Sequence, residues 1–420
     1  MDNSPISRAR NSNSFCLLPF THMATKTHGD VKLCCRSRPV SNIKQQSLRE
    51  IWNSDRYRQI RADLLSGQRP SECAICWDQE DVGVISMRQR FNVARQDQWH
   101  HVEKCSNDYS MPFEVPVLEL KLSNLCNLKC RMCHPLDSSS WWPDWQSIEH
   151  LMEFNNRGTK EKVSAMDGPH LGAWDDPRFW DELAELIPHF EIVEFAGGEP
   201  LIDPIHNRII SMLAPHGDKI RLKYATNLTN LRFGETKFFD IWKKFHSIQL
   251  NVSVDGLGDV YEYVRQGADW QQLIHNIETV KQLPNVILII QKTVQIYNVH
   301  QLPDFIEFFV NKMGCAVITH RVDFPRCLSI KCLPPIYKRK MLDSLQSYAD
   351  QILAGMHDWW SPERRKEIHD MLLDEIKILM NHDNSKLLKD FIEFSDILDK
   401  RQAVAKTWRD LLPDLAAEIG

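Results

Sequence analysis

Six strand–helix units follow one another between residues 116 and 325 and constrain the fold more than any other feature. Strand-like segments, rich in β-branched residues, cover 116–122, 191–196, 219–225, 247–254, 286–295 and 315–324. Amphipathic helical patterns follow several of them, at 204–213, 236–245, 259–283 and 302–313. Alternation of this kind is typical of parallel sheets with right-handed crossovers. The count of six favours an α/β fold with a partial (β/α)6 TIM-type barrel over an open sheet.

The segments on either side of this expected barrel differ from it. Residues 1–105 hold five clustered cysteines and a helical pattern at 47–67, which predicts a small cysteine-rich N-terminal domain. Residues 335–420 carry charged helical patterns, such as 364–380, which predict a helical C-terminal extension. We therefore expect three domains, at 1–105, 116–325 and 335–420.

Composition narrows the class of protein. The 51 Lys and Arg residues against 56 Asp and Glu give a formal net charge of -5, which argues against a nucleic-acid partner. No apolar run approaches the roughly 20 residues that a membrane span requires, and the polar N-terminus does not resemble a signal peptide. We expect a soluble cytoplasmic protein. In a reducing compartment, 12 cysteines in clusters indicate metal ligands rather than disulfides.

Three cysteines lie within eight residues, directly after the first expected strand. Cys126, Cys130 and Cys133 form a CxxxCxxC pattern, whereas structural zinc sites usually have four ligands. Three thiolates from one loop suit a [4Fe–4S] cluster whose fourth iron stays open. Because open coordination positions are characteristic of catalytic metal sites, the pattern predicts a small external ligand on that iron.

This loop, followed by GGEP after the second strand, resembles the radical SAM superfamily. The resemblance implies that the open iron binds S-adenosylmethionine through its amino and carboxylate groups. It further implies that one electron cleaves this cosubstrate to a 5′-deoxyadenosyl radical, which abstracts a hydrogen atom from a substrate. Electrons would come from a reductant such as flavodoxin or ferredoxin.

The same resemblance assigns contacts with the cosubstrate to residues at successive strand ends: Gly197, Gly198, Glu199 and Pro200; Thr226 and Asn227; Ser253 and Asp255; Arg265; and Met132. The GGEP residues would receive the amino group, Arg265 the carboxylate and Ser253 the ribose. The adenine would pack near Val294 and Gln295. Met132 departs from the family, which commonly has an aromatic residue there, although a thioether can fill the same apolar role.

A second group of cysteines lies in the N-terminal segment. Cys73 and Cys76 form a CxxC pair, and Cys16 and Cys34 are candidates for two further ligands. Four thiolates would close either a zinc site or a [4Fe–4S] cluster, and the spacing leaves both open. The segment is also similar to the SPASM/twitch module of radical SAM enzymes, in GDVKLCC, SLREIWNSDRYRQIR and CAICWDQED. That similarity implies a second, auxiliary [4Fe–4S] cluster, and it favours Cys34 over Cys35 as a ligand.

The sequence thus predicts a radical SAM enzyme that modifies a substrate, with a peptide or protein as the first candidate. A small metabolite, sugar or nucleotide is an alternative, as is a non-catalytic binding protein stabilised by zinc or an iron–sulfur cluster. An RNA substrate fits the mildly acidic chain less well. His320 and Asp323 are weak candidates for a general base, and Cys327 and Cys332 for hydrogen donors. The C-terminal helices would bind substrate, form a dimer or cover the barrel.

Overall fold

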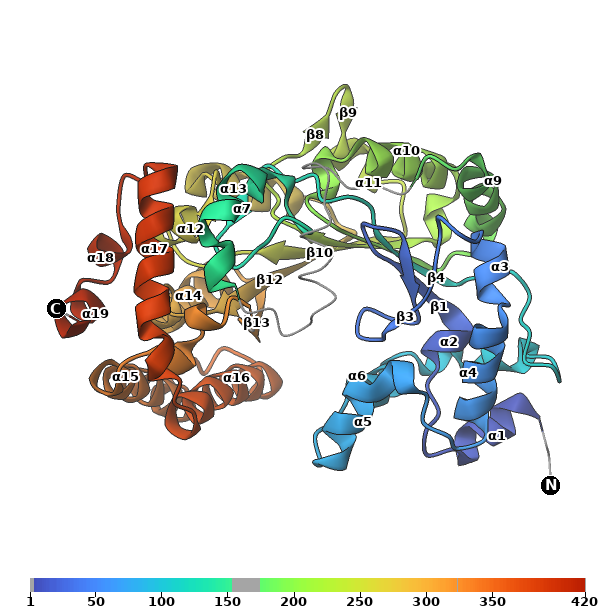
Figure 1. The fold of residues 1–420 in the computed structure, drawn as a ribbon, viewed down its shortest axis with the longest axis horizontal. Coiled ribbons are helices and arrows are strands. Elements are labelled where there is room, and N and C mark those ends of the chain that lie inside the picture. The colour runs from blue at the N-terminus through green and yellow to red at the C-terminus, as the bar shows by residue number, and fades with distance from the viewer. Residues whose placement is uncertain (1–3, 153–173, 323, 420) are drawn as a thin grey trace. The chain divides into compact units, whose positions relative to one another are not determined.

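The computed structural model describes residues 4–152, 174–322 and 324–419 (Figure 1). The chain forms two compact units. Unit 1 comprises residues 1–125, 170–225 and 232–249, and unit 2 comprises residues 126–169, 226–231 and 250–420. Strand β10 (Ser247–Ser253) begins in unit 1 and ends in unit 2.

The sheet of unit 1 contains the first three strands of the expected barrel. Strands β4 (Val117–Lys121), β6 (Ile192–Ala196) and β7 (Arg221–Thr226) pair in parallel, with Val117 opposite Ile192 and Ile192 opposite Arg221. Helices α9 (Pro177–Leu186), α10 (Pro204–Leu213) and α11 (Phe238–Trp242) belong to the same unit. The buried side chains of α10, among them Ile209, Ile210 and Leu213, form its apolar stripe.

The cysteine-rich segment adds three short strands to this sheet. Strand β1 (His22–Thr25) runs parallel to β4, and β2 (Asp30–Lys32) and β3 (Pro39–Asn42) follow in antiparallel pairs. The order within unit 1 is therefore β10-β7-β6-β4-β1-β2-β3. The sequence had not predicted strands here.

Further helices of the N-terminal segment are short. The single helix expected over 47–67 is two helices, α3 (Leu48–Trp52) and α4 (Asp55–Leu65). The break has a local cause, because the Ser54 side chain caps α4 by accepting a hydrogen bond from the Tyr57 amide. Helix α1 (Pro5–Asn11) precedes them, and α5 (Ala74–Asp81), α6 (Met87–Ala94) and a 3-10 helix (Gln96–Lys104) follow.

Unit 2 contains the remaining strands, in the order β10-β12-β13. Strands β12 (Val286–Val294) and β13 (Ala316–Arg321) pair in parallel. The run expected to be one helix over 259–283 is α12 (Asp259–Val264), then β11 (Arg265–Gln266), then α13 (Trp270–Val280). Strand β11 pairs with β5 (Lys129–Cys130) in the cysteine loop, and Gly267, at φ +95, allows the chain to turn into α13. Helix α14 (Leu302–Ile306) continues as a π-helical turn over Glu307–Lys312.

The C-terminal part of unit 2 is helical, as expected. Helices α15 (Pro335–Leu353) and α16 (Pro362–Asn381) lie side by side (Figure 1). Helix α17 (Leu388–Gln402) packs against α7 (Trp142–Ile148), and α18 (Trp408–Leu411) and α19 (Pro413–Ile419) follow it.

The prediction of the fold class is confirmed. The chain is a mixed α/β protein with a large parallel sheet, consistent with a partial (β/α)6 barrel, and a helical C-terminus. The six expected barrel strands correspond to β4, β6, β7, β10, β12 and β13. Within the described ranges, no helix combines the length and apolar character that crossing a membrane would require.

Candidate functional site

The three central cysteines lie on one loop of unit 2 whose backbone is fixed by hydrogen bonds. The Cys133 amide donates to the Cys130 carbonyl at 2.8 Å, which closes a turn between these two residues. The Ser140 hydroxyl donates to the Cys126 carbonyl at 2.5 Å, and the Trp141 indole donates to the Cys130 carbonyl at 3.0 Å. The loop is therefore held in one conformation by its own unit.

A buried arginine contacts the middle cysteine. Nη1 of Arg265 donates to Sγ of Cys130 at 3.5 Å, and Nη2 forms an ion pair with Oδ2 of Asp255 at 2.7 Å. The other oxygen of Asp255 accepts a hydrogen bond from the Thr293 amide at 2.6 Å. Burial alone would lower the pKa of Arg265, but Asp255 and Cys130 together raise it. A permanent positive charge next to Cys130 favours its thiolate form, which is the form that binds metal.

Of the candidate residues at the ends of β7 and β10, Asn227 contacts this loop directly. Asn227 donates through Nδ2 to Oδ1 of Asn127, the residue after Cys126, at 3.0 Å. Thr226 accepts a hydrogen bond from the Leu228 amide at 2.9 Å, so its hydroxyl shapes the turn after β7. Ser253 is half-buried at the end of β10.

The position before the third cysteine is near the end of β12. Nε2 of Gln295 lies 4.0 Å from Sδ of Met132, and Val294 is fully buried beside it. Met132 and Gln295 therefore lie together, and their contact with adenine stays a prediction. His320 lies in β13, and Asp323 lies outside the described residues.

Cys327 and Cys332 are buried in two 3-10 turns that follow β13. Burial raises the pKa of Cys327 to about 12 and that of Cys332 to about 11. Both are therefore protonated thiols at neutral pH.

The GGEP residues lie in unit 1 and pack on the backbone that leads into the cysteine loop. A Cβ atom on Gly197 would lie 2.7 Å from the Ser123 carbonyl oxygen, and one on Gly198 would lie 2.1 Å from that of Leu125. The Gly198 and Glu199 amides donate to these same two oxygens, both at 2.8 Å. Only glycine fits at Gly198, because any side chain would collide with backbone.

The acidic residue of this motif is buried. The Glu199 carboxylate is 1% exposed and accepts a hydrogen bond from the Leu201 amide at 3.0 Å. Pro200, also buried, starts the short 3-10 turn that this bond caps.

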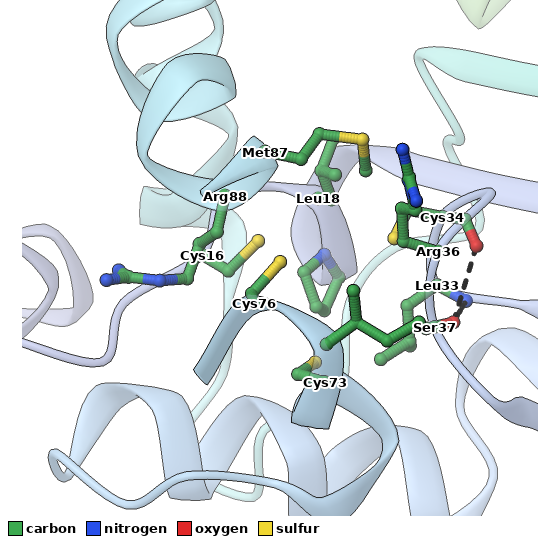
Figure 2. Close-up of a pocket in the computed structure, with 12 residues that line it drawn as sticks. Cys16, Leu18, Leu33, Cys34, Arg36, Ser37, Cys73, Cys76, Met87 and Arg88 are labelled. Atoms are coloured by element: carbon green, nitrogen blue, oxygen red, sulfur yellow. Dashed lines mark hydrogen bonds between the residues drawn. The ribbon is translucent and has the colours of Figure 1, made fainter. Parts of the chain in front are cut away.

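Four cysteines of unit 1 line one cavity, shown in Figure 2. They come from three separate segments: Cys16 precedes α2 (Leu18–Thr21), Cys34 follows β2, and Cys73 and Cys76 flank the start of α5. Cys35 does not line this cavity; it is exposed, and its sulfur lies 3.8 Å from that of Met87. The geometry thus places Cys34, rather than Cys35, with the other three.

Two arginines, Arg36 and Arg88, line the same cavity. Arg88 forms an ion pair with Glu80 at 2.6 Å and donates to the Phe15 carbonyl at 2.5 Å. Burial raises the pKa of Cys73 to about 12 and that of Cys16 well above its ordinary value, while Arg88 lowers both. Such buried thiols become thiolates when a cationic centre binds them.

The spacing of the sulfur atoms distinguishes two kinds of metal centre. A tetrahedral zinc site with Zn–S bonds of about 2.3 Å brings its sulfurs to about 3.8 Å from one another. Among the described residues, no three cysteine sulfurs lie within 4.8 Å of one another. The described sulfurs of both groups are therefore not arranged as a closed zinc site, and their donor chemistry fits an iron–sulfur cluster.

Sequence reasoning missed several residues of these sites. Met87 and Arg88 line the N-terminal cavity but lie outside any cysteine spacing. Asp399 binds Arg131 of the central loop at 2.6 Å from the far end of the chain. No sequence pattern pointed to these contacts, because each joins segments that local periodicity does not connect.

Two family models match the chain. Residues 120–308 match the radical SAM superfamily, and residues 16–77 match the SPASM iron–sulfur cluster-binding domain. These ranges contain the central cysteine loop and the four cysteines of the N-terminal cavity. The comparison with curated proteins gives no match.

Several solved structures show a weak likeness. A structure of native anSMEcpe with bound AdoMet has 17% identity and a TM-score of 0.38, covering 57% of this chain and 61% of that one. Streptococcus suis SuiB bound to precursor peptide SuiA has 13% identity and a TM-score of 0.33, covering 67% of this chain and 60% of that one. This chain thus spans about three-fifths of their lengths, and at these scores nothing about activity is taken from them.

Proposed function

Since this chain belongs to the radical SAM superfamily and carries an SPASM domain, we propose that it cleaves S-adenosylmethionine reductively and modifies a peptide or protein by hydrogen abstraction. The cofactors of these two domains are a [4Fe–4S] cluster, S-adenosylmethionine and an auxiliary iron–sulfur cluster. Cys126, Cys130 and Cys133 would hold the first cluster. Four residues would hold the auxiliary one: Cys16, Cys34, Cys73 and Cys76. When bound and reduced, the first cluster supplies the electron that breaks the sulfonium and yields the 5′-deoxyadenosyl radical.

The observation that carries this proposal is the contact of Arg265 with Cys130. An N–H donor at 3.5 Å from one of three cysteines on a fixed loop supports anionic sulfur at that position. Asp255 balances the charge of Arg265 and fixes its orientation through the 2.7 Å ion pair. These residues therefore support the thiolate of Cys130, the middle of three cysteines in a loop that has no fourth.

Binding of the cosubstrate is the proposed role of the strand-end residues. Gly197 and Gly198 allow their backbone to pack against the residues that precede Cys126. Glu199, the next residue in the chain, has a buried carboxylate. A buried carboxylate suits an ammonium group. Thr226, Asn227 and Ser253 stay predicted contacts. Arg265 also stays a predicted partner of the methionine carboxylate, although its guanidinium already binds Asp255.

The substrate class rests on the SPASM match, because the family resemblance favours a peptide or protein for enzymes with this module. A one-electron donor such as flavodoxin or ferredoxin would be the physiological reductant. A small metabolite, sugar or nucleotide is the alternative substrate, and it would be modified by the same radical chemistry. Screening peptide pools and metabolite pools for substrate-dependent consumption of S-adenosylmethionine separates these classes.

The experiment that tests the proposed activity uses the anaerobically reconstituted chain. We expect roughly eight irons per chain, two clusters of four, and 5′-deoxyadenosine after addition of dithionite and S-adenosylmethionine. The triple variant C126A/C130A/C133A should keep about half of the iron and form no nucleoside. Bound zinc with no nucleoside product in the wild type would instead show a non-catalytic, metal-stabilised protein.

A further inference from the structure

An arginine within the central cysteine loop points into the helical part of unit 2. Arg131 follows Cys130 directly and its side chain is 0% exposed. Its amide donates to the Val264 carbonyl at 2.9 Å, and its Nε donates to the Tyr263 carbonyl at 3.2 Å. The guanidinium carbon lies 3.7 Å from the centre of the Tyr263 ring. Arg131 therefore carries a positive charge that has no access to water.

One carboxylate compensates this charge. Oδ1 of Asp399, on α17, accepts hydrogen bonds from Nη2 of Arg131 at 2.6 Å and from the Tyr263 hydroxyl at 2.8 Å. Its other oxygen accepts from the Trp408 amide at 3.0 Å. Both oxygens are thus occupied, and the Asp399 side chain is only 7% exposed. The carboxylate joins the cysteine loop to the C-terminal helices.

A second ion-pair group joins the same two segments. Asp144 accepts from Nζ of Lys129, the residue before Cys130, at 2.8 Å. It also accepts from Nε of Arg401 on α17 at 3.2 Å. In addition, Gln266 of β11 donates to the Gln402 carbonyl at 3.4 Å. The last turn of α17 therefore binds β11 directly and β5 through Asp144, and these two strands form the ladder that contains Cys130.

We propose that Asp399 is a positioning residue of the cysteine loop, and that α17 forms part of the site that binds the radical SAM cluster. Asp399 fixes the loop through Arg131 and cancels the charge that this arginine places beside the cysteines. The inference rests on the proposed function for the identity of the cluster. It gives the C-terminal extension a role within the site itself, in holding the ligand loop.

Two measurable consequences follow. Loss of the contact loosens the loop, so D399N and R131M should each release iron from this cluster to a chelator about ten-fold faster than wild type. D399N also leaves the Arg131 charge uncompensated, which stabilises the reduced, more negative cluster. The midpoint potential of the cluster should therefore rise in D399N and return toward the wild-type value in R131M/D399N. A merely structural role would not separate D399N from the double variant in this way.

The measurement uses the holoenzyme, with the cluster identified as the component of the reduced EPR spectrum that responds to S-adenosylmethionine. The matched control is D396N, because Asp396 lies on the same helix but binds Trp408 at 2.8 Å and Arg409 at 2.5 Å. We expect iron release and potential in D396N to match wild type. The signal of the auxiliary cluster, held in unit 1, should be unchanged in every variant.

Unchanged iron release in D399N, or equal potentials in D399N and R131M/D399N, would overturn the inference. If D399N does not fold, the R401M variant tests the inference in its place. The Arg401 side chain is 43% exposed, so the fold should tolerate its loss. Iron release should be faster in R401M than in wild type, and an unchanged rate would overturn the inference equally. A wild type without any component that responds to S-adenosylmethionine would refute the proposed function instead.

Discussion

Arg265 and Cys130 face each other in the β5–β11 ladder, and the guanidinium of Arg265 donates to the Cys130 sulfur at 3.5 Å. The two residues are 135 positions apart in the sequence. Their pairing through both backbone and side chain fixes the position of the middle cysteine. Because Asp255 holds the other edge of the guanidinium, the distance from charge to sulfur is set by the fold rather than by a ligand.

This contact predicts an effect on the redox potential. Hydrogen bonds to the sulfurs and nearby positive charge stabilise the reduced form of an iron–sulfur cluster. R265M should therefore lower the midpoint potential of the cluster held by Cys126, Cys130 and Cys133, and R265K should lower it less. EPR-monitored potentiometry of both variants checks this. The control is R321M, an arginine of β13 that is 45% exposed and pairs with Asp374 and Glu375. Equal potentials in wild type and R265M would contradict the assignment.

The N-terminal cavity predicts different outcomes for two adjacent cysteines. Cys34 lines the cavity with Cys16, Cys73 and Cys76, whereas Cys35 is exposed outside it. C34A should lose the auxiliary cluster, about four irons per chain, and C35A should keep it. Iron and sulfide analysis of the two variants after anaerobic reconstitution measures this. Loss of iron in C35A with retention in C34A would reverse the assignment.

The glycine at position 198 predicts a steric effect at the GGEP turn. A methyl group on Gly198 would lie 2.1 Å from the Leu125 carbonyl oxygen, so the backbone before Cys126 must move. G198A should destabilise the protein by about 1–3 kcal/mol, as overpacking commonly does, and weaken binding of S-adenosylmethionine. Equilibrium dialysis with the labelled cosubstrate measures the binding.

A second glycine serves as its control. Gly234 has a φ of +55 and no atom within 4 Å of an added Cβ, and asparagine tolerates this conformation. G234N should therefore bind the cosubstrate like wild type. Wild-type binding by G198A as well would show that the turn does not need a glycine there.

A buried carboxyl group in the C-terminal extension predicts a pH dependence. Burial raises the pKa of Glu375 to about 7, and its side chain is 2% exposed. The folded protein thus keeps this proton to a higher pH than the unfolded chain, in which a glutamate loses it near pH 4.5. The free energy of unfolding should therefore fall by up to about 3 kcal/mol as the pH rises from about 4.5 to about 7.

The measurement compares denaturant unfolding of wild type and E375Q at pH 5 and pH 8. The glutamine of E375Q cannot ionise. The variant should therefore exceed wild type in free energy of unfolding by little at pH 5 and by much more at pH 8. E367Q is the control, because Glu367 is exposed on the same helix, α16. An equal advantage of E375Q at both pH values would contradict the raised pKa.

Several barrel strands could be predicted from the sequence because apolar residues recur along them, as in β10, where buried and half-buried residues alternate. The expected segment 191–196 is β6 (Ile192–Ala196), and the expected helix 204–213 coincides with α10. The short strands β1 to β3 could not be predicted, since they have only three or four residues and no clear alternation. The pairing of β1 with β4, and of β2 and β3 beyond it, comes from tertiary contacts.

Parts of the candidate site depend on contacts that no local pattern encodes. Helical periodicity runs through Arg265 and Gln266, so the strand that places Arg265 opposite Cys130 was missed. The choice between Cys34 and Cys35 depends on the direction of side chains in one turn. Arg131 and Asp399 are 268 positions apart, and their ion pair follows from how α17 packs in unit 2.

The central claim is that three cysteines of one loop hold a cluster whose open iron binds S-adenosylmethionine. The most direct test is the EPR spectrum of the dithionite-reduced, oxygen-protected protein before and after addition of S-adenosylmethionine. The account predicts that one [4Fe–4S] signal changes on addition and that C126A/C130A/C133A lacks this signal. Identical spectra with and without the cosubstrate, in a wild type loaded with both clusters, would contradict it.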